Sequence, residues 1–535
     1  MIVDSLTVSN DETIDTDVCI AGAGIAGITL ARELIGAHCR VCLVECGGLK
    51  PDNVTQSFFW GESVGHPYYP LDTTRSCGMG GSGHRWNIDL QTGDFGVRLH
   101  PLAAIDFEKR DWVPNSGWPF NKTHLDPFYE RAQQVCKVGP YSYDAEEWQD
   151  PDRTPCLPFK NDRVQTTIFQ FAGRKTFIDE HSQSVGCADN IKTLIHAHVT
   201  RIETNESADR VERLQIECLN KKRFWLTAKH FILALGAIET ARLLLISNDR
   251  QSSGLGNQND LVGRYFMEHP HLWSGRFIPA NRRQVKLTGL YRLHWCKGTP
   301  IMGKLTINED VQRSSKLLNY CVSIHPVVIG HRPNVTPDWQ IVGWPLLDAK
   351  QPLERSSNSN LFRSAYHSAH GLMNRIYRSI HSLDVVFSLN HMAEQVPNSN
   401  SRVMLAEEKD SLGRRRTRLD WQMVPSDILS IVKAQEIIDQ ELRNSGLGRL
   451  VIDLKQDKPP SDLHGGWHHM GTTRMHDDHR KGVVDQNSKV YGLSNLFIAG
   501  PSVFPTCGYA NPVLTIVALA LRLADHIKAD LEIKF

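Results

Sequence analysis

The pattern that most restricts the fold lies within the first 45 residues. A short apolar run at 17–21 ends at Gly22-Ala23-Gly24-Ile25-Ala26-Gly27, and residues 25–36 then carry apolar side chains at helical spacing. A second apolar run at 40–44 ends in Glu45. Short apolar runs of this kind are typical of buried parallel strands, so their order predicts a strand–helix–strand unit of the dinucleotide-binding type.

Each residue type in this segment suits a bound nucleotide. Gly22 permits the tight turn, Gly24 lets the backbone approach a pyrophosphate, and Gly27 lets the helix pack closely on the strand. The helix N-terminus offers free N–H groups to the anion, and Glu45 is placed to bind the ribose hydroxyls. The predicted nucleotide site contains Gly22, Gly24, Ile25, Ala26, Gly27 and Glu45. The pattern does not distinguish FAD from NAD, and a coincidental glycine-rich turn is the alternative.

Two further segments combine glycine with polar side chains. Residues 75–87 contain four glycines, which suits close approach of the backbone to a flat or anionic ligand. Residues 464–479 contain five histidines, so a metal site must be considered. Gly465 and Gly466 make a helix there unlikely to form, and no helical His-Glu-x-x-His motif is present. We therefore expect no metal.

Taken together, the fingerprint at residues 22–27 and the segments 465–475 and 495–512 resemble the glucose-methanol-choline (GMC) family of flavin-dependent alcohol oxidoreductases. The resemblance implies bound FAD. It also implies that His468, three residues before Gly471 in a His-x-x-Gly-Thr pattern, is the catalytic base. Asn511, before Pro512, matches the second catalytic position. A neutral imidazole can accept the hydroxyl proton, Asn511 can hold the alcohol oxygen, and flavin N5 takes the hydride. The alternatives are a structural role for His468 and a helix-capping role for Asn511.

The same resemblance assigns further cofactor contacts. The glycine-rich loop is expected to line the flavin, residues 229–242 to return beneath the FAD, Val199 to bracket the adenine, and Gly500 to contact the cofactor. The helix that begins near Pro512 is expected to direct its positive dipole end at the flavin. The residues assigned in this way are Arg75, Gly80, Gly81, Ser82, His84, Trp86, Val199, Ala234, Gly236, Gly500, Asn511 and Pro512.

The mode of flavin attachment follows from a departure from the family pattern. Some GMC branches have a histidine four residues after the double glycine that bonds covalently to the flavin, whereas this chain has Arg85 there and His84 one residue early. We expect non-covalent FAD, with His84 as a covalent anchor the alternative. Residues 106–132 resemble the branch that includes pyranose oxidase and the gluconate and aminoglycoside alcohol dehydrogenases.

The expected architecture is an α/β fold, α+β overall. A Rossmann-like FAD-binding domain is predicted from residues 1–100, 190–275 and 461–535. Residues 101–189 and 276–460 are predicted to form a substrate domain, an antiparallel sheet flanked by helices, with connecting and lid segments.

Composition excludes several other functions. Lys+Arg 60 against Asp+Glu 59 gives a net charge of +1, which argues against a nucleic-acid or membrane-surface binder. No apolar run approaches the ~20 residues of a membrane span. The N-terminus lacks the features of an export signal, so we expect a cytoplasmic protein whose 12 cysteines are reduced thiols.

The predicted function is FAD-dependent oxidation of a CH–OH group in a sugar, cyclitol or related polyol, with O2 or another molecule as electron acceptor. Four alternatives stay open. They are a nicotinamide-dependent oxidoreductase, the flavoprotein subunit of an electron-transferring sugar-acid dehydrogenase, a redox-inactive flavoprotein, and a flavoprotein that catalyses a lyase or isomerisation step.

Overall fold

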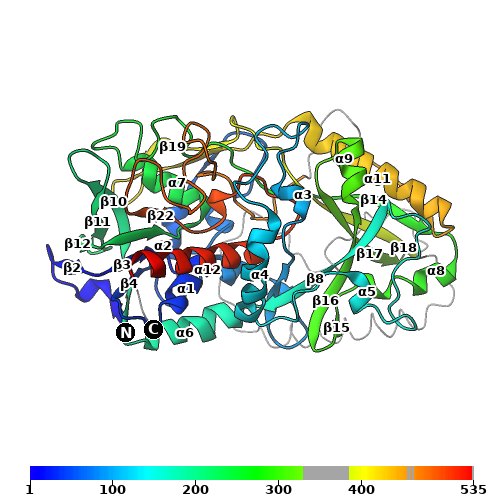
Figure 1. Ribbon diagram of the computed structural model, residues 1–535, viewed down its shortest axis with the longest axis horizontal. Coiled ribbons are helices and arrows are strands. Elements are labelled where there is room, and N and C mark those ends of the chain that lie inside the picture. Colours follow the sequence, from blue (N-terminus) through cyan, green and yellow to red (C-terminus); the bar gives the residue numbers. More distant parts are fainter. Residues whose placement is uncertain (329–384, 455–458, 461–462, 533–535) are drawn as a thin grey trace.

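The computed structural model describes residues 1–328, 385–454, 459–460 and 463–532. They form a mixed α/β fold around two large sheets (Figure 1). Toward the left of Figure 1 lies a parallel sheet with helices α1 (Ile25–Glu33) and α12 (Val513–Asp530). Toward the right lies an antiparallel sheet with α11 (Pro425–Asn444). The predicted fold class, with its Rossmann-like unit and antiparallel sheet, is confirmed.

The parallel sheet has six strands in the order β1-β9-β4-β3-β13-β22. These are β1 (Ile2–Asp4), β3 (Val18–Ala21), β4 (Val41–Val44), β9 (Ile191–Ile195), β13 (His230–Leu233) and β22 (Leu496–Ile498). Every residue of β3, β4 and β13 is buried, as expected for a parallel sheet covered on both faces. The predicted strand–helix–strand unit is therefore present, although α1 ends at Glu33 and not at Gly36.

A smaller sheet contains the strands that were predicted in the middle of the chain. Its order is β10-β11-β12-β2, and the first three strands are antiparallel neighbours. The bounds are β2 (Thr13–Asp15), β10 (His198–Thr204), β11 (Val211–Glu217) and β12 (Arg223–Thr227). Helix α7 (Gly236–Ile246) begins where β13 ends, as the apolar strand and glycine turn predicted.

The large antiparallel sheet runs in the order β21-β14-β18-β17-β16-β8-β7-β6, with β15 paired to β16. Its strands are β6 (Ile88–Asp89), β7 (Phe95–Leu99), β8 (Val164–Gly173), β14 (His271–Pro279), β15 (His294–Cys296), β16 (Thr299–Ile307), β17 (Tyr320–Val328), β18 (Val385–Ala393) and β21 (Gly448–Val451). Helix α11 packs on one face of this sheet, where Gln435 lies near Leu389 of β18.

The remaining elements connect and cover these sheets. Helix α4 (Lys122–Cys136) packs against α12, as α1 also does. The others are α2 (Asn53–Gln56), α3 (Ala104–Phe107), α5 (Ala145–Trp148), α6 (Ser182–Cys187), α8 (Arg282–Lys286), α9 (Glu309–Ser315) and the small sheet of β5 (Gly61–Ser63), β19 (Arg402–Lys409) and β20 (Arg415–Asp420).

The domain boundaries given above stay a prediction. Strands β6 and β7 belong to the antiparallel sheet, although they fall within the segment 1–100. Among the helices of the described residues, none has both the length and the apolar character needed to cross a membrane.

Candidate active site

A cavity extends from the N-terminus of α1 to the N-terminus of α12 and brings together most residues predicted for the cofactor site. Those that line it are Gly22, Gly24, Ile25, Ala26, Glu45, Arg75, Gly81, Ser82, Trp86, Val199, Ala234, Gly236, Gly500, Asn511 and Pro512, together with His468. Segments from both ends and the middle of the chain therefore meet around one space.

Three predicted residues, Gly27, Gly80 and His84, are not part of the lining. A Cβ added at Gly27 would lie 1.9 Å from the carbonyl oxygen of Gly22, so Gly27 serves close packing of helix on strand. The N–H of Gly80 donates to the carbonyl of Ala23 at 2.8 Å. The Nε2 atom of His84 lies 2.8 Å from the carbonyl oxygen of Met79, so this side chain is bound to its own loop.

The glycines around the cavity leave room that a side chain would fill. Gly236 and Gly500 have φ angles of 74° and 123°, and a Cβ added to either would meet no atom within 4 Å. Both line the cavity, so the bare backbone borders open space where a flat ligand can approach. The bare backbone at these two positions therefore leaves room for a flat ligand beside the wall of the cavity.

Glu45 holds three backbone segments together at the nucleotide end. Its carboxylate accepts hydrogen bonds from the N–H groups of Ala23 at 2.9 Å, Gly47 at 3.0 Å and Gly78 at 2.9 Å. Burial raises the pKa of this carboxyl, while the backbone donors act in the opposite direction. The residue predicted to bind the ribose thus also fixes the second glycine-rich loop against the fingerprint.

Cysteines beside Glu45 correct one expectation. Cys46 and Cys77 are paired in a disulfide, whereas we expected all 12 cysteines to be free thiols. The two residues are 31 positions apart and were not adjacent in any motif. They meet because Glu45 draws the loop at Gly78 onto the end of β4. With Glu45 they also form a group whose ligand atoms lie close enough to hold a metal ion, but sulfurs bonded to each other are not thiolate ligands.

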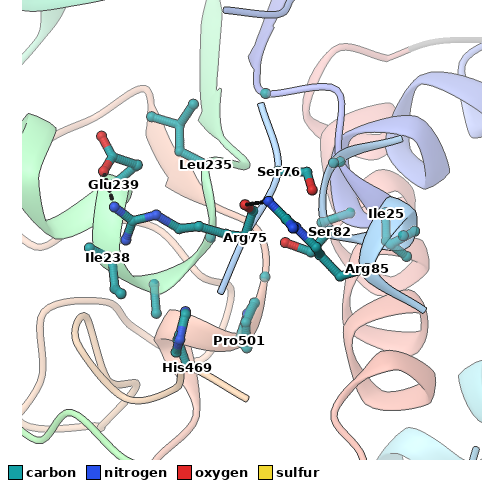
Figure 2. A pocket seen from close by; sticks show the side chains of 18 of the residues that line it. Ile25, Arg75, Ser76, Ser82, Arg85, Leu235, Ile238, Glu239, His469 and Pro501 are labelled. Carbon is teal, nitrogen blue, oxygen red and sulfur yellow. Dashed lines mark hydrogen bonds and ion pairs between the residues drawn. The ribbon is translucent and has the colours of Figure 1, made fainter. Parts of the chain in front are cut away.

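Buried arginines with carboxylate partners line the middle of the cavity. Arg75 pairs with Glu239 at 3.0 Å, as Figure 2 shows, and Arg85 donates to the carbonyl of Arg75. Arg242 pairs with Glu239 at 3.2 Å and with Asp410 at 2.8 Å. The sequence indicated Arg75 alone, because the partners come from distant elements: Glu239 of α7 reaches Arg75, and Asp410, just after β19, reaches Arg242.

The two residues predicted as catalytic are in direct contact. The side-chain nitrogen Nδ2 of Asn511 lies 3.0 Å from Nε2 of His468. Pro512 occupies the N-cap position of α12, and no side chain caps the helix there, so Asn511 is not its cap. His469, adjacent to the base in sequence, turns away and lies 2.9 Å from the hydroxyl of Tyr68.

A third histidine fixes the protonation of His468. Nε2 of His269 lies 3.2 Å from the carbonyl oxygen of Cys507, and a carbonyl only accepts, so this nitrogen carries the proton. Burial lowers the pKa of His269 to about 4, so the ring is neutral and Nδ1 is an acceptor. Nδ1 of His468, at 2.8 Å, must therefore be the donor. The remaining nitrogen of a neutral His468, Nε2, has a free lone pair and accepts from Asn511.

The charge state of His468 supports this assignment. Burial, followed by the proximity of His269 and His469 and the positive charges of Arg98 and Lys304, holds the pKa of His468 well below its usual value. The imidazole is therefore neutral near pH 7, as a general base must be.

Glu268 positions this histidine pair. Its carboxylate accepts from the backbone N–H groups of Gly466 and His468, each at 3.0 Å, and of His269 at 3.1 Å. The hydroxyl of Tyr68 donates to the same carboxylate. Sequence reasoning missed Glu268 and His269. The run Glu268-His269-Pro270-His271, dense in ionisable side chains, is the signal that could have indicated them.

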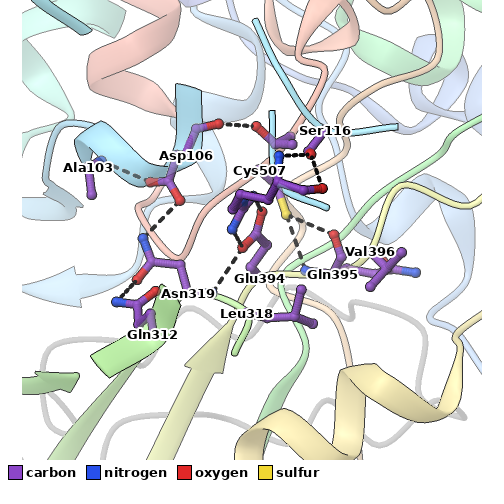
Figure 3. A network of polar contacts seen from close by, with 12 residues as sticks. Ala103, Asp106, Ser116, Gln312, Leu318, Asn319, Glu394, Gln395, Val396 and Cys507 are labelled. Carbon is purple, nitrogen blue, oxygen red and sulfur yellow. Dashed lines mark hydrogen bonds and ion pairs between the residues drawn. The ribbon is translucent and has the colours of Figure 1, made fainter. Parts of the chain in front are cut away.

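A buried polar network supports the turn that carries Cys507 (Figure 3). Arg110 binds both carboxylate oxygens of Glu394, at 2.8 and 2.5 Å, and the amide of Asn319 donates to Asp106 at 2.8 Å. The N–H of Gln395 donates to the sulfur of Cys507. The network therefore joins the start of β17 and the end of β18 to the turn at Cys507, whose carbonyl oxygen orients His269.

Comparisons with known proteins agree with this geometry. Residues 397–520 match the model of the GMC oxidoreductase family. The chain is 24% identical to the fructose dehydrogenase large subunit of Gluconobacter japonicus, over 98% of this chain and 99% of that protein. It is 23% identical to the paromamine 6'-oxidase of Streptomyces fradiae, over 96% and 92% of the two chains. The formate oxidase of Aspergillus oryzae has the same fold, with a TM-score of 0.56 and 14% identity over 98% of this chain and 100% of that one.

The glycine cradle, the pairing of His468 with Asn511, the family match and the two relatives that extend over nearly the whole chain all agree with the resemblance seen in the sequence. The chain resembles GMC oxidoreductases, and its residues 397–520 match the model of that family.

Proposed function

We propose that this protein is an FAD-dependent oxidoreductase that converts a CH–OH group of a sugar, cyclitol or related polyol to the carbonyl, with His468 as general base. The observation that carries the proposal is the lone pair on Nε2 of His468, held toward Asn511 at the wall of the cavity. Two relatives with similarity over nearly their whole length support the substrate class, since their names specify fructose and paromamine.

The residues around the cavity fit FAD. The backbone at Gly24 and Ile25 would hold the pyrophosphate, Glu45 the ribose, and Gly500 and Pro512 the ring system. FAD, when bound, supplies the acceptor for the two electrons that leave the carbinol carbon as a hydride. The hydrogen bond of His84 to Met79 supports non-covalent binding, because it engages the nitrogen Nε2 within the loop.

The protein's own residues handle the hydroxyl proton. Nε2 of His468 takes this proton, and Asn511 holds the alcohol oxygen beside it. The positive charge that develops on His468 is shared through Nδ1–H with the acceptor Nδ1 of His269. The N-terminus of α12 adds a positive dipole end at the same wall, which favours negative charge in the ring system.

Anaerobic mixing with a panel of sugars, cyclitols and simple alcohols tests the proposal. Bleaching of the visible flavin absorbance by one compound, slowed about 10²- to 10⁴-fold in His468→Ala, is the expected result. The variant should keep its flavin absorbance, since His468 is not needed for the glycine cradle. Bleaching at an unchanged rate in His468→Ala would refute the role of the base, and a colourless protein that takes up no FAD would refute the proposal as a whole.

The electron acceptor is a separate question. Because the chain is similar to the large subunit of a fructose dehydrogenase, both O2 and an artificial dye should be tested as electron acceptors. We propose a small-molecule alcohol and either O2 or another acceptor as reaction partners. Turnover with the dye but not with O2 would identify a dehydrogenase, and turnover with O2 an oxidase.

A further inference from the structure

Part of one face of the antiparallel sheet borders the cavity, at Arg98 and His271. Directly paired residues of antiparallel strands point to the same face, as do residues two apart on one strand. Following the register from β14 to β7 therefore identifies the members of this face. The register connects His271, Met392, Cys321, Thr306, Gln165 and, through Phe171, Arg98.

Arg98 and Lys304 are cations on this face, as is the exposed Arg276 beyond the bulge of β14. Arg98 lies on β7, and Lys304 lies on β16 two residues before Thr306. Both Arg98 and His271 line the cavity that contains His468 and Asn511. The opposite face of the sheet carries Leu389, which packs near α11. Arg98 and Lys304 thus point toward the reaction centre and not toward the helix layer.

Neither Arg98 nor Lys304 has a carboxylate partner among the described residues. The side chain of Arg98 makes no hydrogen bond or ion pair there, and its Nε atom is buried without a partner. Lys304 is 3% exposed, and its Nζ lies 3.8 Å from the sulfur of Cys321 and 4.3 Å from the centre of the Phe169 ring. On the described strands this face carries no Asp or Glu. By contrast Arg75, in the same cavity, pairs with Glu239.

Both groups nevertheless remain cationic near pH 7. Burial lowers the pKa of Lys304 to about 8 and that of Arg98 to about 10. An unpaired buried charge is costly, and two such charges near each other are more so. A ligand that brings a negative charge to this place would offset that cost.

We propose that Arg98, backed by the charge of Lys304, is an anion subsite for the substrate, and that the substrate is an alcohol bearing a carboxylate, such as a sugar acid or another hydroxy acid. This inference rests on the proposed function and specifies its substrate class. The guanidinium can bind a carboxylate through two parallel N–H donors, which would fix the hydroxyl at His468. The free Nε of Arg98 is available for one of them.

The position of the cations favours the substrate over the cofactor as the source of the anion. The pyrophosphate belongs at the fingerprint, where α1 begins after Gly24. Arg98 and Lys304 instead act on His468, since their charges help to lower its pKa. They are therefore near the end of the cavity where the alcohol must react.

The experiment compares an acid with its neutral counterpart, for instance gluconate with glucose, in the FAD-loaded protein. The wild type should have a higher kcat/KM for the acid. Arg98→Met should lower kcat/KM for the acid about 10- to 150-fold, the range for hydrogen bonds to a charged group, and should leave the neutral compound within about threefold. The kcat/KM of Arg98→Lys for the acid should lie between those of the wild type and Arg98→Met, because lysine keeps the charge and loses the second donor. Arg276→Met, an exposed arginine on β14 of the same sheet, is the matched control.

A binding readout keeps the test independent of turnover. Acetate and oxalate should perturb the visible flavin spectrum of the wild type, and the apparent Kd should rise about tenfold or more in both Arg98→Met and Lys304→Met. The proposed subsite would be overturned if Arg98→Met lowered kcat/KM equally for acid and neutral substrates, or if its affinity for acetate were unchanged. If Arg98→Met loses FAD but still prefers acids over neutral substrates, the anion that Arg98 binds belongs to the cofactor, and the substrate subsite is overturned. Failure of the proposed function looks different, because no alcohol of either kind would then bleach the flavin.

Discussion

His269 offers the sharpest test of how the structure sets up its base. The His269→Phe variant keeps an aromatic ring of similar size but removes the acceptor for Nδ1–H of His468, which lies 2.8 Å away. A buried donor without a partner costs about 1–3 kcal/mol, which disfavours the tautomer with the proton on Nδ1. The competing tautomer carries its proton on Nε2 and can donate it to Oδ1 of Asn511, an atom that is buried without a partner.

The structure sets the size of the effect. A tautomer shift of about 1.4–2.8 kcal/mol leaves about one tenth to one hundredth of the molecules with a lone pair on Nε2. We therefore expect kcat to fall about 10- to 100-fold with little change in KM. The proximity of His269 is the second cause that lowers the pKa of His468, so its removal should also move the acid limb of the kcat/KM profile to higher pH. In the wild type that limb should lie well below pH 6.5.

Stopped-flow reduction of the flavin between pH 5 and 8 gives both quantities. His269→Asn is the matched variant, because its Oδ1 can take the place of Nδ1 as acceptor, and it should recover part of the lost rate. A His269→Phe variant with an unchanged rate and an unchanged acid limb would refute the tautomer argument. Equal losses in both variants, accompanied by loss of FAD, would show that His269 only supports the fold.

Two further perturbations test the supports of the site. Glu268→Gln puts an amide N–H where one carboxylate oxygen accepts from the Tyr68 hydroxyl, and it removes the charge from the group that accepts the three backbone N–H groups. We expect the free energy of unfolding to fall by about 1–3 kcal/mol in urea titrations, and a change under about 0.5 kcal/mol would contradict this interpretation. Gly500→Val sends a branched side chain from a backbone with φ of 123° into the open space of the cradle. Its flavin absorbance per mole of protein should drop severalfold, and full FAD content would show that the ring system lies elsewhere.

Local patterns account for the parts of the fold that were predicted well. Hydrophobic periodicity, the placement of glycines and segment length were enough to predict the fingerprint and its two apolar strands. The elements β3, α1 and β4 form as expected. The contact between His468 and Asn511, 43 residues apart, agrees with the family pattern that indicated both. The chemical roles of these two residues stay a proposal.

The features that the sequence did not indicate depend on distant strands. Cys46 and Cys77 pair because Glu45 gathers two loops, and no motif placed them together. Arg98 and Lys304 share a face only through the register of β7, β8 and β16, which pairs Arg98 with Phe171 and Lys304 with Thr167, residues 73 and 137 positions apart. Strand register is set by global packing, so composition and spacing alone do not reveal such a cluster.

The sequence by itself determined the strand–helix–strand unit of the first 45 residues, the strand and helix near 229–242, and the pair of residues proposed for the chemistry. These follow from short-range periodicity and from glycines whose conformations few other residues adopt. Only the tertiary structure decided which nitrogen of His468 holds a free lone pair and which cations face it. Both depend on hydrogen bonds and charges brought by β7, β16 and the turn at Cys507, because the protonation of a buried ring is set by the neighbours that surround it in space.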